Sequence, residues 1–519
     1  MKKKAIFFCN SHQSCLLLAE KLLKKNWEIF SSSECDVFFE NVSHKKIFSF
    51  EKESENFLAY LELLSEITTA GNYCESGSDD ESDELLLLCV EMKFEQKKRN
   101  DSFQSNFVGS VLDEKIASLV LAASKNYKQC IVLCDEADID ALSYAIETET
   151  LTEKFRLYLA EKALNALSAN LAFASRVIAE QIADETHPKF FLEPYKKMKS
   201  FESGASLYAV PKYGSLSTIK KVQGPDASEQ NFCDIDALSL FLQNFFSLFK
   251  SAREVSVQTA DNANLAVKLS AFSDSVFAIA TKHGIPIGAA LGESAATSFS
   301  IMHERSKFVS DIAVIAFSSV VDDECAKKII ETNCLCVLAP LFTAEAKSTF
   351  ARKPCTLLMM GRAQNFLHTV QAFDGALLVK NKIANLFDTW HVVTKNFPEQ
   401  ADIDTLAFAQ FMLLGAKTSA AVVAHGMSAT GMCSCALRAS DACFAALEHA
   451  LENEKATGEK SRVLVASDRL SFTENFSYFY EKGIRVIAEC GGDAKDNEFI
   501  DFCNERGMIL IFTKIKVGS

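Results

Sequence analysis

Ala5-Ile-Phe-Phe-Cys9 opens the segment that decides the fold class of this chain. These five consecutive apolar residues predict a short buried strand. Residues 15–25 follow with apolar side chains at helical spacing, and residues 27–31 predict a second strand. A strand, a helix and another strand in succession are typical of a parallel sheet. The opening of the chain therefore predicts an α/β fold.

The rest of the chain continues this alternation of strands and helices. Residues 152–182 contain neither glycine nor proline and predict a long helix, which ends near His187-Pro188 at an expected domain boundary. Residues 114–124 predict another helix. Further strands are predicted at residues 85–90, 129–133, 255–257, 313–317, 336–339, 356–359, 376–379, 420–423, 463–466, 486–488 and 509–512.

Length and composition exclude several classes of function. A chain of 519 residues is long enough for about three or four domains. Its net charge of −14 repels polyanions, which argues against non-specific nucleic-acid binding. The first apolar stretch ends at Cys9, too early for a secretory signal, and no stretch is long enough for a membrane helix. Together with 17 scattered cysteines, this predicts a cytoplasmic protein with free thiols.

A scan for motifs that carry chemistry gives no reaction. The Cys-x-Cys pairs at 334/336 and 433/435 have no histidine close by in sequence, so no metal site is predicted. No Walker loop and no G-x-G-x-x-G after a strand is present. Gly491-Gly492 follows a predicted strand and fits either a plain turn or an anion-facing nest. The acidic residues 75–84 predict a surface loop, with a phosphorylated regulatory loop as the alternative.

Four segments of the C-terminal half carry a resemblance to a known family. They are Trp390-His-Val-Val-Thr-Lys-Asn-Phe-Pro398, Val463-Leu-Val-Ala-Ser-Asp468, Ala488-Glu-Cys-Gly-Gly492 and Gly507-Met-Ile-Leu-Ile-Phe-Thr513. Their order and spacing resemble the bifunctional AICAR transformylase/IMP cyclohydrolase family, which performs the last two steps of IMP synthesis. Upstream, Lys212-Tyr-Gly214, Asn231-Phe-Cys-Asp234, Asp113 and Ala122-Ala-Ser-Lys-Asn126 resemble further motifs of this family.

The resemblance implies a fold, ligands and an assembly. The expected fold is α/β, with a methylglyoxal-synthase-like parallel-sheet domain at residues 1–187. Two deaminase-like α/β/α subdomains without zinc are expected at residues 188–375 and 376–519. The implied ligands are the nucleotides AICAR, FAICAR and IMP, with 10-formyltetrahydrofolate as cosubstrate and no tightly bound cofactor. A homodimer that forms transformylase sites across its interface is implied, and neither nucleic acid nor membrane is an expected partner.

The sequence departs from the family where formyl transfer takes place. The family uses a Lys-His pair for proton transfer, and the aligned residues here are Gln258 and Thr259. Neither is a base near neutral pH, although Asp261 is an alternative base. An aspartate before the Ala-Pro strand end is replaced by Leu335, and of the glycine-rich phosphate segment only the terminal Arg438 keeps its register.

The cyclohydrolase half departs in the same way. The family holds phosphate with backbone amides of Ser-Gly-Gly-Thr, and the corresponding loop here is Ser32-Ser-Glu-Cys35. A carboxylate beside a phosphate dianion is repelled by about 1–4 kcal/mol at about 4 Å. Asp113 and Lys125 persist, either as catalytic residues or, for Lys125, as a cation that suits a helix end.

Two hypotheses follow from this comparison. The first is a catalytically impaired or inactive homologue that keeps the scaffold and a residual nucleotide pocket. The second is an active formyltransferase that acts on AICAR through altered residues, with or without ring closure to IMP. The catalytic candidates are Asp113, Lys125, Gln258, Thr259 and Asp261, and the substrate-binding candidates are Ser31, Ser32, Lys212, Tyr213, Gly214, Asn231, Asp234, Arg438, Ser467, Asp468 and Lys516.

Overall fold

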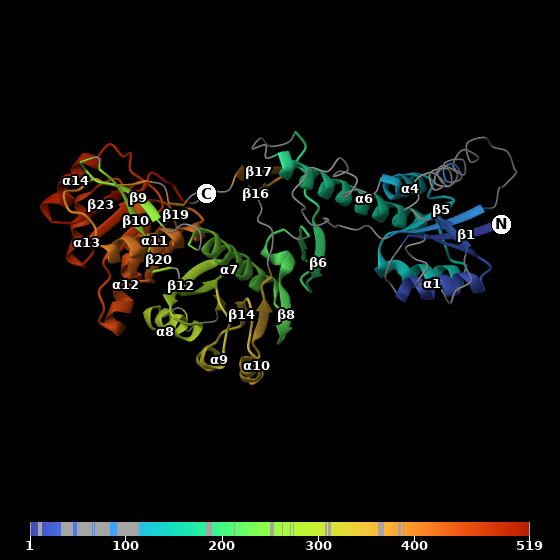
Figure 1. The fold of residues 1–519 in the computed structure, drawn as a ribbon, viewed down its shortest axis with the longest axis horizontal. Helices are drawn as coiled ribbons and strands as arrows, with labels where there is room; N and C mark the ends of the chain where they lie inside the picture. The colour runs from blue at the N-terminus through green and yellow to red at the C-terminus, as the bar shows by residue number, and fades with distance from the viewer. Residues whose placement is uncertain are drawn as a thin grey trace. The chain divides into compact units, whose positions relative to one another are not determined.

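The computed structural model divides the chain into two compact units, Met1–Lys196 and Lys197–Ser519, called unit 1 and unit 2 below. Figure 1 labels their helices and strands. The structure describes residues 2–8, 13–32, 45–48, 65, 67, 84–90, 114–182, 189–211, 213–249, 254–261, 263–269, 271–272, 274–306, 309, 313–361, 368–381, 386–387 and 389–517.

Unit 1 is built on a five-stranded parallel sheet in the order β3-β2-β1-β4-β5. Helices α1 and α5 pack on one face of the sheet, and α4 and α6 pack on the other (Figure 1). The parallel sheet predicted from the first residues is confirmed. The elements are β1 (Lys2–Phe8), α1 (Gln13–Lys24), β2 (Glu28–Ser32), β3 (Lys45–Phe48), β4 (Glu84–Val90), α4 (Glu114–Lys125), β5 (Cys130–Leu133), α5 (Ile139–Glu147) and α6 (Glu153–Ile182).

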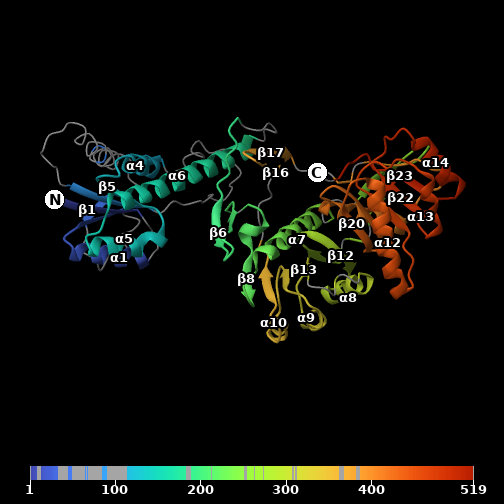
Figure 2. The same cartoon turned by 180° about the vertical axis from the view of Figure 1, so that it is seen from behind.

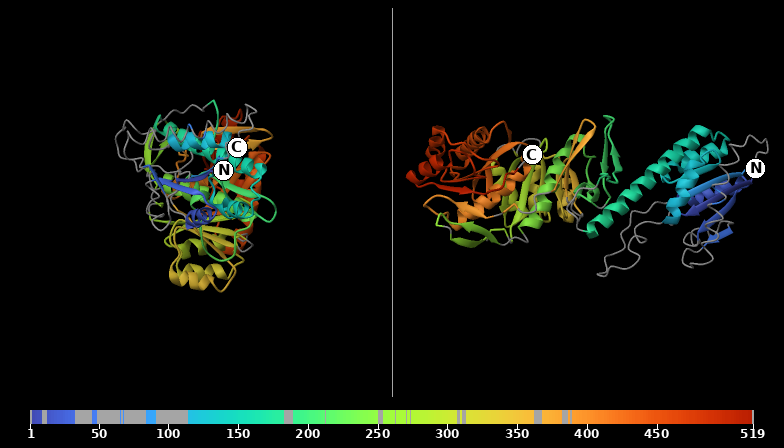
Figure 3. Two further views of the ribbon diagram at one scale, coloured as in Figure 1. Left: turned by 90° about the vertical axis from the view of Figure 1, so that its right-hand side faces the viewer. Right: turned by 90° about the horizontal axis from the view of Figure 1, so that it is seen from above.

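The long helix α6 runs over 30 residues, as the absence of glycine and proline predicted (Figure 3). Its residues Leu159, Ala163, Leu167 and Phe173 are buried. At about 1.5 Å per residue the helix is about 45 Å long. It therefore offers a long outer face as well as a buried one.

Unit 2 is organised around a single sheet of 14 strands in the order β10-β9-β18-β23-β22-β21-β19-β20-β12-β11-β13-β14-β15-β8. Two separate hairpins pair β6 with β7 and β16 with β17. The strands of this unit and its boundary are β6 (Lys196–Ser200), β7 (Ser206–Ala209), β8 (Lys220–Gln223), β9 (Glu254–Gln258), β10 (Asn264–Lys268), β11 (Val276–Lys282), β12 (Ile285–Gly292), β13 (Val314–Phe317), β14 (Cys336–Ala339), β15 (Thr356–Met359), β16 (His368–Phe373), β17 (Ala376–Asn381), β18 (Trp390–Val392), β19 (Ser419–His425), β20 (Ser428–Ala436), β21 (Val463–Ala466), β22 (Val486–Glu489) and β23 (Ile509–Phe512).

Helices cover both faces of this sheet. On one face, α7 and α11 pack over an apolar core that extends across the sheet from Leu338 of β14 to Ile511 of β23. On the other face, α8, α9 and α10 cover the strands β11–β15, and α12, α13 and α14 cover β19 and β21–β23 (Figure 2). The helices are α7 (Glu229–Leu248), α8 (Ala295–Arg305), α9 (Asp323–Ile330), α10 (Ala344–Phe350), α11 (Gln400–Met412), α12 (Ala439–Thr457), α13 (Ser477–Glu481) and α14 (Asp496–Glu505).

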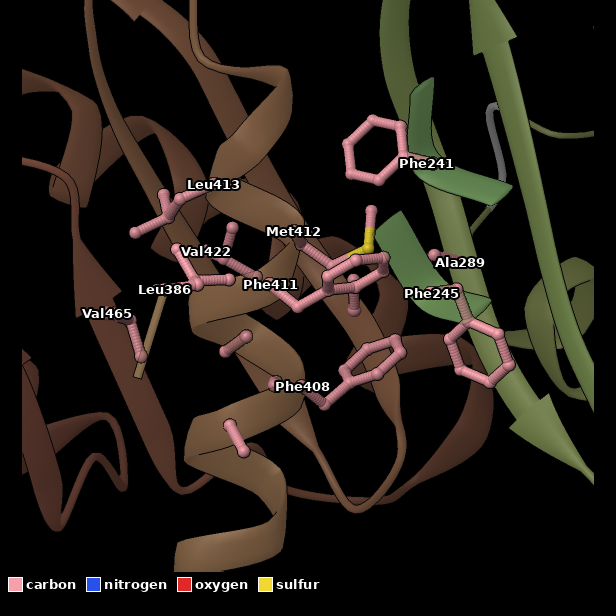
Figure 4. Packing of buried hydrophobic residues seen from close by; sticks show 14 of the residues in the cluster. Phe241, Phe245, Ala289, Leu386, Phe408, Phe411, Met412, Leu413, Val422 and Val465 are labelled. Atoms are coloured by element: carbon pink, nitrogen blue, oxygen red, sulfur yellow. The ribbon is translucent and has the colours of Figure 1, made fainter. Parts of the chain in front are cut away.

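Aromatic side chains join the two helices of the inner face. The ring of Phe411 on α11 lies 5.6 Å from that of Phe241 and 6.2 Å from that of Phe245, both on α7 (Figure 4). Phe245 also stacks on Phe277 of β11 at 5.1 Å. Such pairs add about 0.5–1.5 kcal/mol beyond the apolar area they bury. The centre of unit 2 is therefore a continuous apolar core.

Antiparallel pairing connects the two halves of the large sheet. The pairs β11–β12 and β19–β20 are antiparallel, and β12 meets β20 where Ala289 pairs with Ala429. The sheet is therefore mixed. Because β9 and β10 pair beside β18, a segment before residue 376 completes the half of the sheet that contains β18–β23. The α/β class is confirmed, and the division into domains at 187/188 and 375/376 stays a prediction.

Candidate functional site

Gln258, the last residue of β9, lies beside His391 of β18. The parallel register pairs Gln258 with His391, and β18 in turn pairs His391 with Phe512 of β23. Paired residues in a ladder direct their side chains to the same face, and neighbouring strands lie about 4.8 Å apart. Both side chains are half-buried. The sequence analysis quoted His391 within a family motif but did not count it among the site residues. The feature of the sequence that could have pointed to His391 is its imidazole side chain within that motif.

The hairpin that follows Gln258 uses the other two candidates of this segment differently. The Thr259 hydroxyl accepts a hydrogen bond from the Ala263 amide at 3.1 Å, and the Thr259 amide donates to the Ala263 carbonyl at 2.9 Å. Asp261 is exposed in the turn between β9 and β10. Thr259 therefore closes the turn, and Asp261 projects from an exposed loop.

The carboxyl ends of β21 and β23 bring together three of the predicted binding residues. Ser467 is buried, and its hydroxyl accepts a hydrogen bond from the Ala420 amide at 2.8 Å. The Lys516 ammonium forms an ion pair with the Asp468 carboxylate at 2.5 Å. Partial burial opposes ionisation of Asp468, but the hydrogen bonds from Lys516 and the Arg469 amide hold its pKa below the usual range. The cation of Lys516 is therefore already neutralised within the chain.

Glu489, at the end of β22, is a buried carboxyl group that the sequence analysis did not select. Its Oε2 accepts a hydrogen bond from the Leu470 amide at 2.9 Å, and its Oε1 is buried without a partner among the described residues. Burial raises the pKa of Glu489 to about 7, although the Gly491 and Leu470 amides work against this. The only signal in the sequence was a glutamate that ends an apolar strand.

The turn at Gly491-Gly492 is a nest that the chain fills itself. Both glycines have positive φ angles, 76° and 95°. The Gly492 amide donates to Asp496 Oδ2 at 2.8 Å, and the Asp493 amide donates to Asp496 Oδ1 at 3.1 Å. Amides turned toward one point attract an anion, and here the anion is the side chain of Asp496. Both alternatives of the sequence analysis are thus partly right, because the turn is a nest with an internal carboxylate.

The segment that resembles the glycine-rich phosphate motif is the strand β20. A β-carbon on Gly431 would lie 1.9 Å from the Ala446 carbonyl oxygen of α12, so this glycine permits close packing of helix on strand. Arg438 stands at the N-cap of α12, and its Nε lies 3.0 Å from Asp441 Oδ2. The side chain of Arg438 is largely exposed. This arginine is therefore held by a neighbour on its own helix.

The predicted binding residues near α7 have contacts that stabilise the fold. Asn231 forms a capping box with Ser228 at the start of α7. Asp234 is buried, and its Oδ1 accepts a hydrogen bond from the Gly284 amide at 2.8 Å. Tyr213 is buried, and Gly214 has a φ of 69° at the start of a short 3₁₀ turn. The contacts of Asn231 and Asp234 are therefore ones that hold α7 in place.

In unit 1 the predicted candidates are only partly described. Lys125 is exposed at the end of α4, where a cation is favoured by the helix dipole. Ser31 and Ser32 end β2, and their backbones pair with Lys46 and Phe48 of β3. Several other predictions lie outside the described residues: Asp113, Lys212, the loop residues 33–35 and the acidic residues 75–83.

A further charged cluster follows β5 in unit 1. The ammonium of Lys162 on α6 lies 2.8 Å from Asp135 Oδ2 and 2.5 Å from Asp138 Oδ2. Partial burial favours the neutral amine, but the two carboxylates outweigh it and raise the pKa of Lys162. The cluster lies at the carboxyl end of a parallel sheet, where ligands bind in many α/β proteins. Both carboxylates are, however, already paired with the same ammonium.

Metal and membrane sites can be assessed only for the described part of the chain. Within it, no group of three or more histidine, cysteine, aspartate or glutamate side chains could hold a metal ion. The described cysteines are free thiols. Among the described helices, none is long and apolar enough to cross a membrane.

A parallel-sheet unit followed by a large mixed-sheet unit, with polar residues at the ends of β9 and β21–β23, defines an α/β protein of two units. The sequence pattern of the AICARFT/IMPCHase bienzyme family matches residues 123–449, which is more than half of the chain. The chain belongs to this family. The resemblance found in the sequence is confirmed.

Individual relatives agree with this assignment at low identity. The chain is 26% identical to the bifunctional purine biosynthesis protein PurH of Brachyspira hyodysenteriae, covering 82% of this chain and 79% of the relative. It is 23% identical to PurH of Clostridium perfringens strain SM101, covering 99% of each chain. It is 26% identical to PurH of Aquifex aeolicus, covering 77% of this chain and 74% of the relative. This chain is therefore a divergent member that spans the full length of some relatives.

Proposed function

We propose that this protein is a catalytically impaired member of the AICARFT/IMPCHase family that keeps the scaffold and a residual pocket for a purine-type nucleotide. Its ligands would be AICAR, FAICAR or IMP. A homodimer and a cytoplasmic location are part of the same proposal, and both rest on the resemblance to the family. The observation that carries the proposal is the chemistry at the end of β9, where Gln258 and Thr259 stand in place of a Lys-His pair.

Formyl transfer needs proton transfer at two points. The weakly basic amine of AICAR attacks the formyl carbon of 10-formyltetrahydrofolate and must lose a proton, and the folate nitrogen must gain one as it leaves. Gln258 donates and accepts hydrogen bonds but carries no proton of suitable pKa. The hydroxyl of Thr259 is used by the Ala263 amide at 3.1 Å. General acid–base help is worth about 10²–10⁴-fold, so its loss from this pair predicts a very slow reaction.

The cations expected to hold the substrate phosphate support the same proposal. Lys516 is paired with Asp468, and Arg438 is paired with Asp441. A phosphate would have to compete with a carboxylate for each of them. The Arg438 pair is exposed and weak, at about 0–1 kcal/mol, so phosphate could still displace it. Binding is therefore expected to survive better than catalysis.

The proposal is tested by steady-state assays of both activities on the full chain. Purified protein is given AICAR and 10-formyltetrahydrofolate in one assay and FAICAR in another, with PurH of Clostridium perfringens as the positive control. We expect turnover at least about 10³-fold below the control in both assays, which lies within the range for lost acid–base catalysis. A thermal-shift titration with AICAR or IMP is expected to give saturable stabilisation. Turnover within about tenfold of the control would contradict the proposal.

One observation favours the alternative of an active formyltransferase. His391 lies beside Gln258 on the same face of the sheet, and an imidazole is the side chain best suited to move a proton near neutral pH. Under this alternative, His391 would take the amine proton that the missing Lys-His pair would otherwise take.

Replacing His391 with asparagine decides between the two functions. If the protein is active through His391, His391→Asn is expected to lower kcat by about 10²–10⁴-fold. If the protein is instead catalytically impaired, we expect the variant and the parent protein to have the same background rate. The Tm of the variant, measured in parallel, separates lost chemistry from lost folding.

A further inference from the structure

Two cysteine side chains of unit 1 are in contact although they are far apart in the sequence. The Sγ atoms of Cys15 and Cys89 lie 3.9 Å apart, and 74 positions separate the two residues along the chain. Cys15 belongs to α1, and Cys89 belongs to β4. Both side chains are buried in the apolar cluster between this helix and the sheet. The fold therefore places two thiols against each other inside unit 1.

The distance between the two sulfurs is short enough for a bond to form after a small movement. A disulfide joins its sulfurs at about 2.05 Å, so these two must approach by about 1.9 Å. Cys89 is held in the sheet, because it pairs with Phe7 of β1 on one side and with Leu133 of β5 on the other. Cys15 is the third residue of α1, in the first turn, where amide groups have no acceptors within the helix. The movement that closes the distance therefore falls on Cys15 and its turn.

Other contacts of α1 keep Cys15 close to Cys89. Leu18 and Leu22, further along the helix, are buried in the same apolar cluster as the two cysteines. On the exposed side of the first turn, the Ser14 hydroxyl donates a hydrogen bond to Glu136 Oε1 at 2.7 Å. Neither sulfur takes part in these contacts, so a bond between the sulfurs leaves them in place. The helix therefore holds the two sulfurs at short range whether they are bonded or not.

The cysteine pair lies near the edge of the sheet at which the parallel strands end. Cys89 is the next-to-last residue of β4. Phe7 pairs with Cys89 on one side and with Ser31 of β2 on the other, so Cys89 and Ser31 are two strands apart. Ligands bind at this edge in many α/β proteins, and Ser31 is one of the predicted substrate-binding residues. A bond between Cys15 and Cys89 would therefore fix the start of α1 at the edge where a ligand is expected.

We propose that Cys15 and Cys89 form a reversible disulfide when the protein meets hydrogen peroxide, and that this bond locks the first turn of α1 against β4. Peroxide oxidises one thiol to a sulfenic acid, and one water molecule leaves. The other thiol attacks the sulfenic sulfur, the S–S bond forms, and a second water molecule leaves. Two thiols and one peroxide thus give one disulfide and two waters. A dithiol such as dithiothreitol reduces the bond by exchange and is itself oxidised to a disulfide.

The burial of the pair favours a small oxidant. Cys15 and Cys89 are only 5% and 3% exposed, and hydrogen peroxide is little larger than a water molecule. In a reducing cytoplasm thiols are kept reduced, and the disulfides that do form there are mostly transient and redox-sensing. The proposed bond is of this kind. It does not depend on the catalytic state of the protein, because neither cysteine is a candidate for catalysis or substrate binding.

Peptide mapping of the full chain tests the bond. The reduced protein is treated with hydrogen peroxide, raised until the exposed Cys435 is oxidised, and is then unfolded in N-ethylmaleimide and digested without reductant. Mass spectrometry is expected to find the peptide that contains Cys15 linked to the peptide that contains Cys89, and dithiothreitol is expected to remove the link. Recovery of Cys15 and Cys89 as blocked thiols would overturn the proposal. So would a link from either of them to another cysteine.

Hydrogen exchange measures the effect of the bond on α1. In the oxidised parent protein, the amides of Gln13–Lys24 are expected to exchange about tenfold or more slowly than in the reduced protein, because the bond restrains local opening. Cys15→Ala should exchange equally with and without peroxide. Cys130→Ala is the matched control, because Cys130 is buried on the other face of the same sheet and should leave the redox difference unchanged. Equal exchange in the oxidised and reduced parent protein would contradict the lock.

Discussion

Replacing Gly431 with alanine is expected to destabilise unit 2 by more than about 3 kcal/mol. The new β-carbon would lie 1.9 Å from the Ala446 carbonyl oxygen and 2.7 Å from the Ala450 amide nitrogen. Both atoms belong to the backbone of α12, so no side chain can move aside to relieve the clash. The helix would have to shift away from β20, and the core formed by Leu447, Leu464 and Phe479 would loosen.

The measurement is urea unfolding followed by tryptophan fluorescence. The chain has two tryptophans, Trp27 in unit 1 and Trp390 in unit 2. In a Trp27→Phe background the buried Trp390 reports the unfolding of unit 2 alone. Gly458→Ala is the control, because Gly458 has a φ of 75° but open space around it. It should cost about 1 kcal/mol. Equal losses in the free energy of unfolding for both variants would contradict the claim that the packing of α12 requires a residue without a side chain at position 431.

Replacing Glu489 with glutamine is expected to stabilise unit 2, by up to about 3 kcal/mol above pH 7.5. The reason is that burial raises the pKa of this carboxyl group from 4.5 to about 7. A raised pKa means that the folded state holds the proton more tightly than the unfolded state. The stability that Glu489 contributes is therefore complete below about pH 4.5 and is lost as the pH rises to about 7. Glutamine resembles the protonated form and removes this loss.

The pH dependence distinguishes this effect from a general change in packing. The gain should be near zero at pH 4.5, grow between pH 5 and pH 7, and stay constant above pH 7.5, measured with the same Trp390 signal. Glu481→Gln is the control, because Glu481 is exposed at the end of α13. A gain that does not change with pH would contradict the raised pKa of Glu489.

The local pattern of the sequence predicted most of the strands that form the parallel parts of the fold. Residues 336–339, 463–466 and 509–512 are continuous apolar runs, and each forms the strand it predicted. Such runs are buried on both faces, so tertiary contacts do not alter them. The strands β11, β12 and β20 were not predicted, so the antiparallel hairpins β11–β12 and β19–β20 were not predicted either. Their direction depends on which strands meet in space, and a short apolar run does not encode that.

The candidate site was predictable only where residues are close in sequence or share a strand end. Asp468 and Lys516 were both selected, and the structure joins them because the parallel strands β21 and β23 end at the same edge. His391 and Glu489 were not selected. The position of His391 depends on the pairing of β9, β18 and β23, and the raised pKa of Glu489 depends on its burial. A pattern of residues along the sequence contains neither. The ion pair also changes the role expected of Lys516, because the carboxylate of Asp468 in the same chain balances its positive charge.

These observations fit a protein in which contacts that serve the fold have taken over positions that the sequence predicted to bind ligands. Gly431 serves the packing of α12, and the nest at Gly492 holds Asp496. Arg438 and Lys516 each hold a neighbouring carboxylate. None of these contacts moves a proton. A scaffold of this kind can bind a nucleotide without converting it, and the slow step would then be the chemistry itself.

A single-turnover experiment tests this account most directly. The full chain, in molar excess over radiolabelled AICAR, is mixed with saturating 10-formyltetrahydrofolate, and the labelled product is quantified over time after quenching. Because every substrate molecule can be bound, the rate reports chemistry rather than affinity or product release. The account predicts that AICAR is bound but that formylation stays at the rate of the protein-free reaction. Conversion of the bound AICAR within seconds would contradict it.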